Sequence, residues 1–464
     1  MDGRINRRLL MKSTVVAAIA TPVLARAAVA DPLRRTAVVS AAIPDLPWPA
    51  ANEIVRNTKL PSFPDKNFDA TAYGAKGDNK TDNTEAFKKA IAACNAAGGG
   101  HVIVPKGTYV TGAVHLLSNV DFHLEDGVLL KFSGDASKFP TVLTRYEGIE
   151  CMNRSPMVYA YKQTNIALTG KGTLDAGATG SWNKGSDRSY LESLVAKGTP
   201  PEKRVVPGSG KNMRSTFIEP YSCDTVLIQG VTLKNPKFWQ IHPTLCKSVT
   251  VDDVHTDPTT SANNTDACDP ESCDHVVISN SDLGAHDDNV AIKSGRDEDG
   301  RRVNVPCQNL VVVNCRMNGN WGAITCGSEQ TGGIRNVYGY KLNCVNATKF
   351  ALYVKSNTKR GGFSQNINLD SVSGTFARAF VYVTTTYNSQ TGGNVPKFGP
   401  FYVSNCSSTK ASKVLDVSGL SQEHVKGLEL RDSKFTVSST TNTVKNVDGL
   451  KFTNVTANGK PMTK

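Results

Sequence analysis

The 464-residue chain lacks the features of membrane-spanning and of disordered proteins. No uninterrupted apolar stretch reaches the roughly 18 to 20 residues that a membrane span needs, and there is no long run of like charges and no low-complexity tract. Charged residues make up only 20% of the sequence and hydrophobic residues 39%, which is a globular composition. These absences exclude an integral membrane protein and a mainly disordered one, so we expect no membrane partner.

The sequence also lacks a CxxC pair, which argues against a zinc site of that type. Its eleven cysteines are an odd number in a long chain, which excludes a small scaffold held by disulfides. Four of them each stand three residues before a valine or leucine: Cys223, Cys246, Cys273 and Cys307. Because a free cysteine packs like a small apolar side chain, this recurrence predicts a reduced cysteine ladder in the interior. One or two disulfides between neighbours are the alternative.

The first 30 residues are typical of an export signal rather than of a folded segment. Arg7 and Arg8 precede a mild apolar run from Val15 to Leu24, and small residues after it offer A-x-A cleavage sites. This pattern predicts a twin-arginine signal peptide over residues 1–30 and a periplasmic or secreted protein.

The formal net charge is +12, from 53 basic and 41 acidic residues. No basic helix with interleaved aromatic residues and no nucleic-acid-binding motif is present, so we expect no nucleic-acid partner. In an exported protein, a basic balance favours an acidic polysaccharide as the partner. We expect the protein to be a monomer.

Two segments precede the main repeat. Residues 31–66 contain six prolines, which we expect to break every regular element, so this segment is predicted to be an extended leader that wraps or links. An amphipathic helix is predicted over residues 82–97, with Asp82 or Thr81 as its N-cap and Gly98 to Gly100 as its stop. The apolar positions that recur at helical spacing are Ala86, Phe87, Ala90, Ile91 and Cys94.

Short strand-like runs dominate the chain after Gly100. Their apolar starts recur every 23 to 34 residues, at Val226, Val249, Val276, Leu310 and Val337. This period predicts an all-β, single-domain right-handed parallel β-helix over residues 67–464, with the helix at 82–97 capping one end. A β-sandwich is the alternative, but the tight hairpin turns that it needs are mostly missing. Residues 170–214 are rich in Gly, Ser, Lys and Pro and predict a long projecting loop.

Acidic residues cluster on two neighbouring turns of this repeat. The segment NNTDACDP contains Asp266 and Asp269, and HDDNVAIKSG contains Asp287 and Asp288. Clustered carboxylates repel one another, so a fold retains them for a shared proton, a bound cation or acid–base chemistry. Cleavage of a glycosidic bond uses one protonated and one ionised carboxyl group. Calcium is an equal alternative from the spacing, because Asp and Asn oxygens suit it.

Several longer segments match a known family. They are YGAKGDNKTDNTEAFKKAI, GGGHVIVPKGTY, HLLSNVDFHLEDGVLLKFS, NPKFWQIHP and the pair NTD and DD. With them the chain resembles glycoside hydrolase family 28, the polygalacturonase group of pectin-degrading enzymes, over nearly all of its mature length. The resemblance implies a parallel β-helix, hydrolysis with inversion, and no metal or other cofactor.

The resemblance also implies roles for single residues. Asp287 matches the general acid, and Asp266 and Asp288 match the carboxylates that position and deprotonate the water. Asn264 would orient this cluster, and Lys355 in LYVKSN matches a lysine that binds a galacturonate carboxylate.

Other polar residues near the acidic pair have less specific roles. Lys293 and Arg296, just beyond it, are placed where cations could meet the acid groups of the substrate, with solvated surface charges as the alternative. Asp269 is expected to cap a turn. His242 is expected to serve in packing or hydrogen bonding.

Two positions depart from the family pattern. Asn320-Trp321-Gly322 replaces the usual Gly-His-Gly, and Tyr353-Val354-Lys355 replaces Arg-Ile-Lys. A tyrosine cannot grip a carboxylate in the bidentate way that a guanidinium does. Trp321 could stack on a sugar face or fill the interior of a coil.

We therefore expect an exported, inverting glycoside hydrolase that cleaves α-galacturonosyl linkages of pectin, with a weak preference for exo action. One alternative is a hydrolase of a different pectic linkage, such as that of rhamnogalacturonan. Another is a β-helix that binds an acidic glycan without cutting it. A calcium-dependent pectate lyase shares the fold, but no motif of that group is present.

Overall fold

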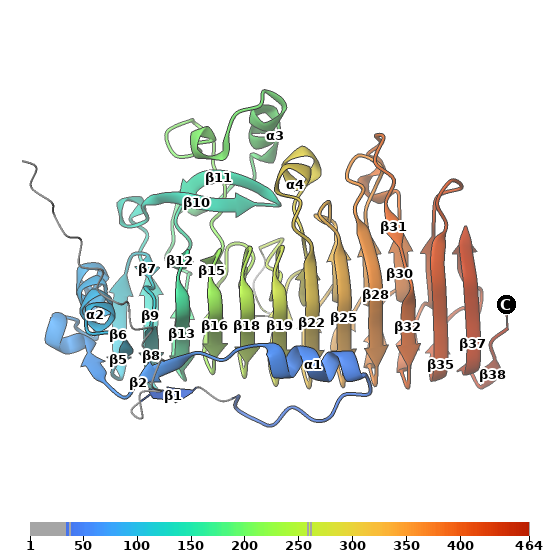
Figure 1. Ribbon diagram of the computed structural model, residues 1–464, viewed down its shortest axis with the longest axis horizontal. Coiled ribbons are helices and arrows are strands. Elements are labelled where there is room, and N and C mark those ends of the chain that lie inside the picture. Colours follow the sequence, from blue (N-terminus) through green and yellow to red (C-terminus); the bar gives the residue numbers. More distant parts are fainter. Residues whose placement is uncertain (1–33, 37–38, 258, 260–261, 464) are drawn as a thin grey trace, which may run out of the picture.

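The protein forms one long stack of parallel coils (Figure 1). This computed structural model describes residues 34–36, 39–257, 259 and 262–463. The predicted signal peptide at residues 1–30 lies outside the described residues, as do the first three residues of the predicted leader. Each coil contributes strands to as many as three parallel sheets, which we call S1, S2 and S3.

Sheet S1 carries the candidate site. Isolated parallel bridges at Ile241 and Cys268 connect its two halves. Its strands are β7 (Val114–His115), β12 (Val158–Tyr161), β15 (Ile218–Tyr221), β21 (Val290–Ile292), β24 (Gly322–Gly327), β27 (Phe350–Lys355), β30 (Ala379–Thr384), β34 (Lys413–Ser418) and β36 (Thr443–Lys445).

Sheets S2 and S3 form the other two sides of the coils. The strands of S2 are β3 (Asn67–Asp69), β5 (Gly100–Val104), β8 (Val120–Leu124), β13 (Thr164–Gly170), β16 (Asp224–Gln229), β18 (Lys247–Asp252), β19 (Asp274–Ser279), β22 (Cys307–Val313), β25 (Ile334–Tyr340), β28 (Phe363–Asp370), β31 (Lys397–Phe398) and β32 (Phe401–Ser404). Those of S3 are β4 (Asp78–Asp82), β6 (Gly107–Thr111), β9 (Val128–Phe132), β14 (Thr173–Asp175), β17 (Thr232–Lys234), β20 (Asp282–Ala285), β23 (Arg316–Gly319), β26 (Asn343–Thr348), β29 (Ser373–Phe376) and β33 (Ser407–Ala411). Two long strands run through both sheets, β35 (Val425–Val437) and β37 (Val447–Ala457).

A few elements stand outside the coils. Antiparallel pairs join β1 (Arg34–Thr36) to β2 (Ser62–Pro64), β10 (Thr141–Tyr146) to β11 (Ile149–Arg154), and β38 (Lys460–Pro461) to β37. The α-helices are α1 (Pro49–Asn57), α2 (Thr84–Ala96), α3 (Arg188–Ala196) and α4 (Asp297–Val303). Short 3-10 helices lie at Ala70–Tyr73, Ala136–Lys138, Ser181–Asn183, Pro201–Lys203 and Tyr387–Ser389.

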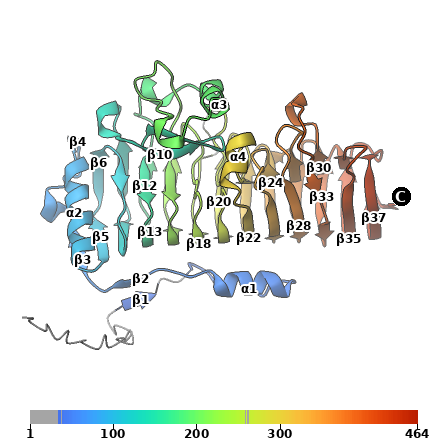
Figure 2. The same ribbon diagram turned by 45° about the horizontal axis from the view of Figure 1, so that its top comes forward.

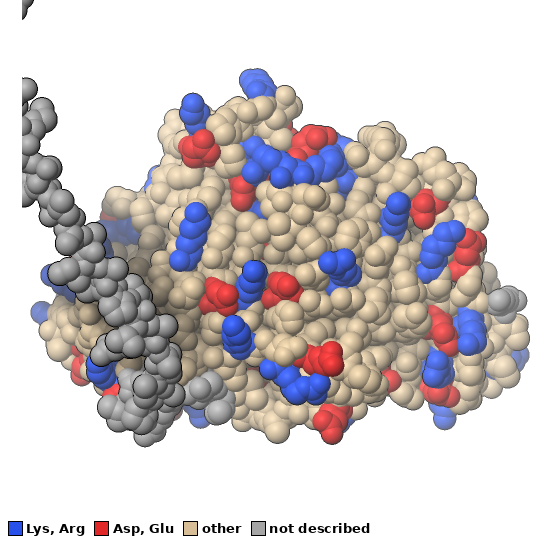
Figure 3. All heavy atoms as spheres, viewed as in Figure 1, with Lys and Arg blue, Asp and Glu red and all other residues tan. Residues whose placement is uncertain are grey.

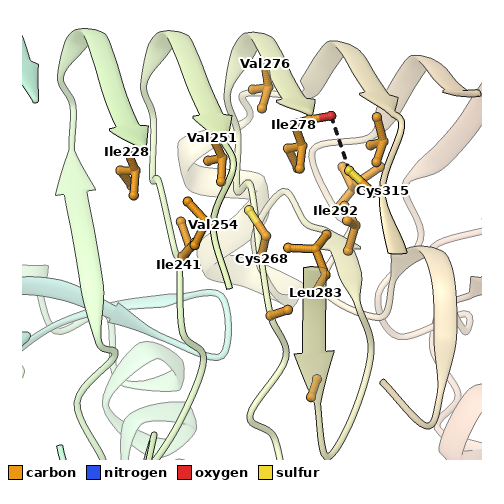
Figure 4. Packing of buried hydrophobic residues seen from close by; sticks show 14 of the residues in the cluster. Ile228, Ile241, Val251, Val254, Cys268, Val276, Ile278, Leu283, Ile292 and Cys315 are labelled. Carbon is orange, nitrogen blue, oxygen red and sulfur yellow. Dashed lines mark hydrogen bonds between the residues drawn. The ribbon is translucent and has the colours of Figure 1, made fainter. Parts of the chain in front are cut away.

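The predicted repeat is confirmed by the register of S2. Each predicted apolar start pairs with the next one, in the order Val226, Val249, Val276, Leu310 and Val337. Their side chains are 2% exposed or less and form part of a continuous apolar column. Figure 4 shows the part of this column around Val276. The fold is therefore the predicted right-handed parallel β-helix and not a β-sandwich.

The predicted cysteine ladder is also confirmed. All eleven cysteines are free and buried. Successive members contact one another, since the backbone N–H groups of Cys223 and Cys273 donate to the Sγ atoms of Cys246 and Cys307, both at 3.4 Å. These cysteines therefore act as small core residues.

Asparagines stack at one corner of the coils. Asn309, Asn336 and Asn366 have φ between 55° and 60°, a left-handed conformation that Asn adopts more easily than most residues. The Nδ2 atom of Asn336 donates to Oδ1 of Asn309, and that of Asn366 to Oδ1 of Asn336, each at 2.9 Å. This ladder keeps the register of neighbouring coils fixed where S2 begins.

Helix α2 covers one end of the stack, as predicted (Figure 1). Its five predicted apolar residues are the ones it buries. The N-cap is Asn83 rather than Asp82 or Thr81, although Oδ1 of Asp82 still accepts the backbone N–H of Thr84 at 2.9 Å. The cap shields the apolar column from solvent at this end.

The prediction that the leader has no regular element was wrong. Helix α1 begins at Pro49, where a proline is tolerated because the first turn of a helix has no partner for its N–H. Figures 1 and 2 show α1 running along the outside of the coils. Ala51 and Ile54 pack there against Val311 and Tyr338 of S2. The leader therefore does wrap the β-helix, as predicted, and does so partly as a helix.

A projecting region rises above S1. The loop predicted at residues 170–214 is confirmed in part: it leaves the coils only after β14, which ends at Asp175, and it contains helix α3 and two 3-10 helices. The hairpin β10–β11, which the sequence did not reveal, lies beneath it and ends beside α4 (Figures 1 and 2). This hairpin borders the candidate site.

One face of the molecule shows how its charged side chains are distributed. On the face shown in Figure 3, basic and acidic side chains are interspersed rather than gathered by sign. Among the described residues, no helix has the length and apolar character that crossing a membrane requires.

Candidate active site

Asp266, Asp287 and Asp288 come together on S1, as predicted. One oxygen of each lies within 4.8 Å of the others. The parallel register explains this, because the backbone N–H of Ala267 donates to the carbonyl of Asp288 at 3.1 Å and so aligns the two coils. Residues at equivalent positions of neighbouring coils therefore carry the cluster.

Asp288 is held rigidly. Its Oδ1 accepts the backbone N–H of Gly322 and the hydroxyl of Thr325, both at 2.8 Å, and its Oδ2 lies 2.9 Å from Nζ of Lys355. A Cβ at position 322 would stand 2.0 Å from Oγ1 of Thr325, so this close approach requires glycine. Asp288 is thus a fixed acceptor that is 1% exposed.

Asp287 is the most accessible of the three acids. Burial, and then the neighbouring Asp288 carboxylate, raises the pKa of Asp287 to about 6, while Lys355 and Lys293 oppose the rise. Nδ2 of Asn264 makes a long contact of 3.5 Å with Oδ2 of Asp287, and its orienting role stays a prediction. Asp287 can therefore hold a proton in mildly acidic solution.

Asn264 is itself held by an arginine that the sequence analysis did not single out. Nη2 of Arg214 donates to Oδ1 of Asn264 at 3.2 Å, and Nη1 donates to the carbonyl of Asn263 at 2.6 Å. The Arg214 guanidinium lies 4.7 Å from the ring centre of Phe238. Arg214 lies at the end of the projecting loop, so tertiary structure alone connects it to the site.

Asp266 and Asp269 share a buried ammonium group. Nζ of Lys293 lies 3.7 Å from Asp266, 3.3 Å from Asp269 and 3.4 Å from Glu329. Burial raises the pKa of Asp266 well above its ordinary value, and raises that of Asp269 to about 7. The expectation that Asp269 caps a turn was wrong, because neither of its oxygens accepts a hydrogen bond from any described residue.

Arg296 forms ion pairs with carboxylates of the protein itself. Its Nη2 lies 2.9 Å from Oε2 of Glu147 and pairs closely with Glu329. Glu147 stands at the tip of the β10–β11 hairpin, next to Gly148, where a Cβ would meet the backbone N of Arg296 at 2.7 Å. Contact of Lys293 and Arg296 with substrate stays a prediction, since both are already paired in this structure.

A network of buried charges fixes the hairpin on S1. Arg145 is 2% exposed, and its Nη1 lies 3.1 Å from Oε1 of Glu271. Nε2 of His242 lies 2.9 Å from Oε2 of Glu271, and Glu219 lies on the other side of the ring. Burial lowers the pKa of His242, but these two carboxylates outweigh it and raise the value to about 9. His242 therefore has the predicted hydrogen-bonding role.

The hairpin crosses S1 coil by coil. The carbonyl of Leu143 accepts the hydroxyl of Tyr159 at 2.6 Å, and Oγ1 of Thr144 donates to Glu219. Arg145 then pairs with Glu271. The carbonyl of Gly148 accepts the backbone N–H of Arg296 one coil further. These contacts reach from the coil of Tyr159 to that of Arg296. We call the part of S1 beyond them, at Trp321, Tyr353 and Tyr382, the open side.

Aromatic residues line the uncovered side. Tyr353 is 3% exposed and packs on Phe350 and Tyr382, with ring centres 4.6 Å and 5.3 Å apart. Phe350 and Tyr382 are stacked at 4.8 Å. Trp321 is half-buried beside them. Tyr353, which stands where the family pattern has an arginine, therefore belongs to an apolar cluster of aromatic rings that we call the aromatic floor.

The charges beside the acids do not favour a divalent cation. Calcium binds six to eight oxygen ligands. Here two of the three carboxylates already face an ammonium group, Asp266 that of Lys293 and Asp288 that of Lys355. Both ammonium groups would repel a metal ion at this place. The arrangement instead suits acid–base chemistry.

Comparisons with known proteins agree with this arrangement. The structure of a hyperthermoactive exopolygalacturonase from Thermotoga maritima matches with a TM-score of 0.83 and 32% identity, covering 89% of this chain and 96% of that one. An exo-poly-alpha-D-galacturonosidase of Dickeya chrysanthemi is 26% identical over 78% of this chain and 65% of its own length. A probable polygalacturonase of Vitis vinifera is 27% identical over 68% of this chain and 62% of its own. The chain thus spans less than two thirds of these two curated relatives.

The family model for glycosyl hydrolases family 28 matches residues 94–457, which include all of S1 from β7 onward and the three clustered acids. The chain belongs to glycosyl hydrolases family 28.

Proposed function

We propose that this protein hydrolyses α-galacturonosyl linkages of pectin. The observation that carries the proposal is the cluster of Asp266, Asp287 and Asp288, in which one acid has a pKa of about 6 and another is held as an acceptor by Lys355. Glycosidic hydrolysis needs one carboxyl group that donates a proton and one that accepts a proton from water. The named relatives are described as polygalacturonases, which supports the substrate class.

In this mechanism, Asp287 donates its proton to the oxygen of the leaving sugar as the glycosidic bond breaks. A water molecule between Asp266 and Asp288 attacks the anomeric carbon and gives up a proton to one of them. Asp288 suits this acceptor role, because its position is fixed by three donors. The carboxylate oxygens of the cluster lie within 4.8 Å of one another, which is closer than the roughly 6.5 to 9.5 Å between the two carboxyl groups of most inverting enzymes. We therefore propose inversion from the family resemblance and not from this distance.

We further propose exo action. The β10–β11 hairpin covers S1 on one side of the acids, and the contacts of Arg145 with Glu271 and of Gly148 with Arg296 hold it there. A polysaccharide lying along S1 can then extend only over the open side, toward Tyr353 and Tyr382. Release of one short product from a chain end follows from this geometry.

The test is product analysis on polygalacturonate and on rhamnogalacturonan with a chelator present. We expect new reducing ends on polygalacturonate, short products from the first minutes, no unsaturated product, and a first product whose anomeric configuration is inverted by NMR. Release on rhamnogalacturonan alone would redirect the substrate to another pectic linkage. Unsaturated products that disappear with the chelator would identify a lyase, and binding without release would identify a glycan-binding protein.

The pH dependence of this activity is expected to be bell-shaped. Asp287 must hold its proton to donate it, so activity should fall above pH 6, by about tenfold for each further pH unit. The water-activating carboxylate must be ionised to accept a proton, so activity should also fall at the acidic end of the range. Initial rates from pH 3 to 9 measure both limbs. A flat profile from pH 4 to 9 would contradict the carboxylate assignment.

We also propose export through the twin-arginine route and a monomeric protein. The support is the Arg7-Arg8 pattern and the acidic polysaccharide substrate, which occurs outside the cell. Replacing both arginines by lysine in the full chain should stop export, as measured by fractionation, and light scattering gives the oligomeric state.

A further inference from the structure

Other cations occupy the open side of the site, where the family arginine is replaced by Tyr353. Asp287, Trp321, Lys349 and Arg378 stand at equivalent positions of four successive coils. The backbone N–H of Trp321 donates to the carbonyl of Asp287 at 3.2 Å, that of Lys349 to Trp321 at 2.8 Å, and that of Arg378 to Lys349 at 3.2 Å. The two cations thus continue the row that begins at the proposed general acid.

Lys349 is held at the edge of the site without a carboxylate partner. Its Nζ lies 3.2 Å from the ring centre of Trp321, the residue that replaces the family histidine. Burial lowers the pKa of Lys349, while Asp287 acts in the opposite direction and Arg378 adds to the lowering. Lys349 forms no ion pair with any residue that the structure describes, although it lies within electrostatic range of Asp287. The indole ring therefore positions an ammonium group that a ligand carboxylate can reach.

Arg378 is exposed beside the aromatic floor. Its guanidinium carbon lies 5.8 Å from the ring centres of both Phe350 and Tyr382. Within the described ranges, no carboxylate pairs with Arg378. Phe350 is buried, so the aromatic surface beside these cations belongs to Tyr382 and Trp321, which are half-buried. A sugar ring that carries a carboxylate can stack there while its charged group meets a cation.

We propose that Lys349 and Arg378 are specificity-determining residues that bind uronate carboxylates on the open side of Asp287, in place of the arginine that Tyr353 replaces. The inference rests on the proposed function and deepens it. It predicts that the enzyme distinguishes free galacturonate from its methyl ester through these two side chains. Lys355 is a third cation, at the far end of β27 from Lys349.

The experiment compares Lys349→Gln, Arg378→Gln and the double variant on trigalacturonate and on its methyl ester. Each single change should lower kcat/KM for the free acid by about tenfold, mainly through KM, because a charge-assisted hydrogen bond is lost. The rate on the methyl ester should change less than threefold, and Lys349→Arg should restore much of the loss. Arg335→Gln and Lys434→Gln, two exposed changes on S2 and S3, serve as matched controls.

Binding of trigalacturonate to the Asp287→Asn variant, measured by calorimetry, distinguishes a failure of this inference from a failure of the proposed function. If the wild type hydrolyses trigalacturonate but both glutamine variants keep its preference for the free acid, the inference is overturned and the function stands. If the wild type cuts neither substrate and Asp287→Asn does not bind, the proposed function fails and the inference falls with it. Equal losses on acid and ester would show a structural role and also overturn the inference.

Discussion

Replacing Asp287 by Asn is expected to lower kcat on polygalacturonate by about 10²- to 10⁴-fold, the usual contribution of a general acid. Asparagine keeps the size of the side chain and the neighbouring contact with Asn264, but its amide has no acidic proton to transfer to the leaving oxygen. KM should change little, because binding depends on cations and aromatic rings elsewhere on S1. Initial rates over a range of substrate concentrations measure both constants.

The pH profile distinguishes this loss from a misfolded protein. The remaining activity of Asp287→Asn should no longer fall above pH 6, since the group that titrates there is gone. Asp126→Asn is the matched control, because Asp126 is exposed between β8 and β9 and should leave both rate and profile unchanged. An Asp287→Asn enzyme with wild-type kcat would remove Asp287 from the mechanism.

Replacing Arg145 by Met is expected to destabilise the protein by about 3–5 kcal/mol. The buried guanidinium lies between Glu271 at 3.1 Å and Glu150 at 3.7 Å. Its removal takes away the cation that these two carboxylates share, which leaves Glu271 with His242 and Glu150 with Arg302. Burial of an unpaired charge costs far more than the pair itself contributes. The midpoint of urea denaturation, followed by circular dichroism, should therefore fall clearly.

A control variant and a second measurement test whether the loss of stability arises at the hairpin. Arg335→Met removes an exposed arginine from S2 and should change the unfolding free energy by about 0.5 kcal/mol or less. Because Arg145 anchors the hairpin, its loss should also make the chain near Glu147 sensitive to protease. An unchanged midpoint together with an intact hairpin would show that Glu271 and His242 satisfy each other without Arg145.

The sequence predicted the fold well because the β-helix repeats locally. The valines at positions 226, 249 and 276 recur once per coil, and parallel pairing brings residues with the same period into register. The same period predicts that Asp266 and Asp288 lie on neighbouring coils, as they do in the structure. The N-cap of α2 was missed by a single residue, which is the usual uncertainty of helix ends.

Other elements could not be predicted because their partners lie far away in the chain. Helix α1 forms in a proline-rich segment since Ala51 and Ile54 can bury their side chains against S2. The β10–β11 hairpin carries charged residues that look solvent-exposed in sequence, such as Arg145 and Glu150. Their burial depends on Glu271, which no local pattern connects to them.

The sequence by itself determined the coil repeat, the reduced cysteine ladder, the pair of coils that carry the acids and the family resemblance, because each is written in local spacing. Tertiary structure alone decided which charges pair with one another. In the tertiary structure Lys293 and Arg296 pair with protein carboxylates and the hairpin covers part of S1, whereas Lys349 and Arg378 have no ion pair with any residue that the structure describes. The physical reason is that the pKa of a charged group and its choice of partner depend on its surroundings in space. These surroundings form only when coils that are distant in the sequence pack together.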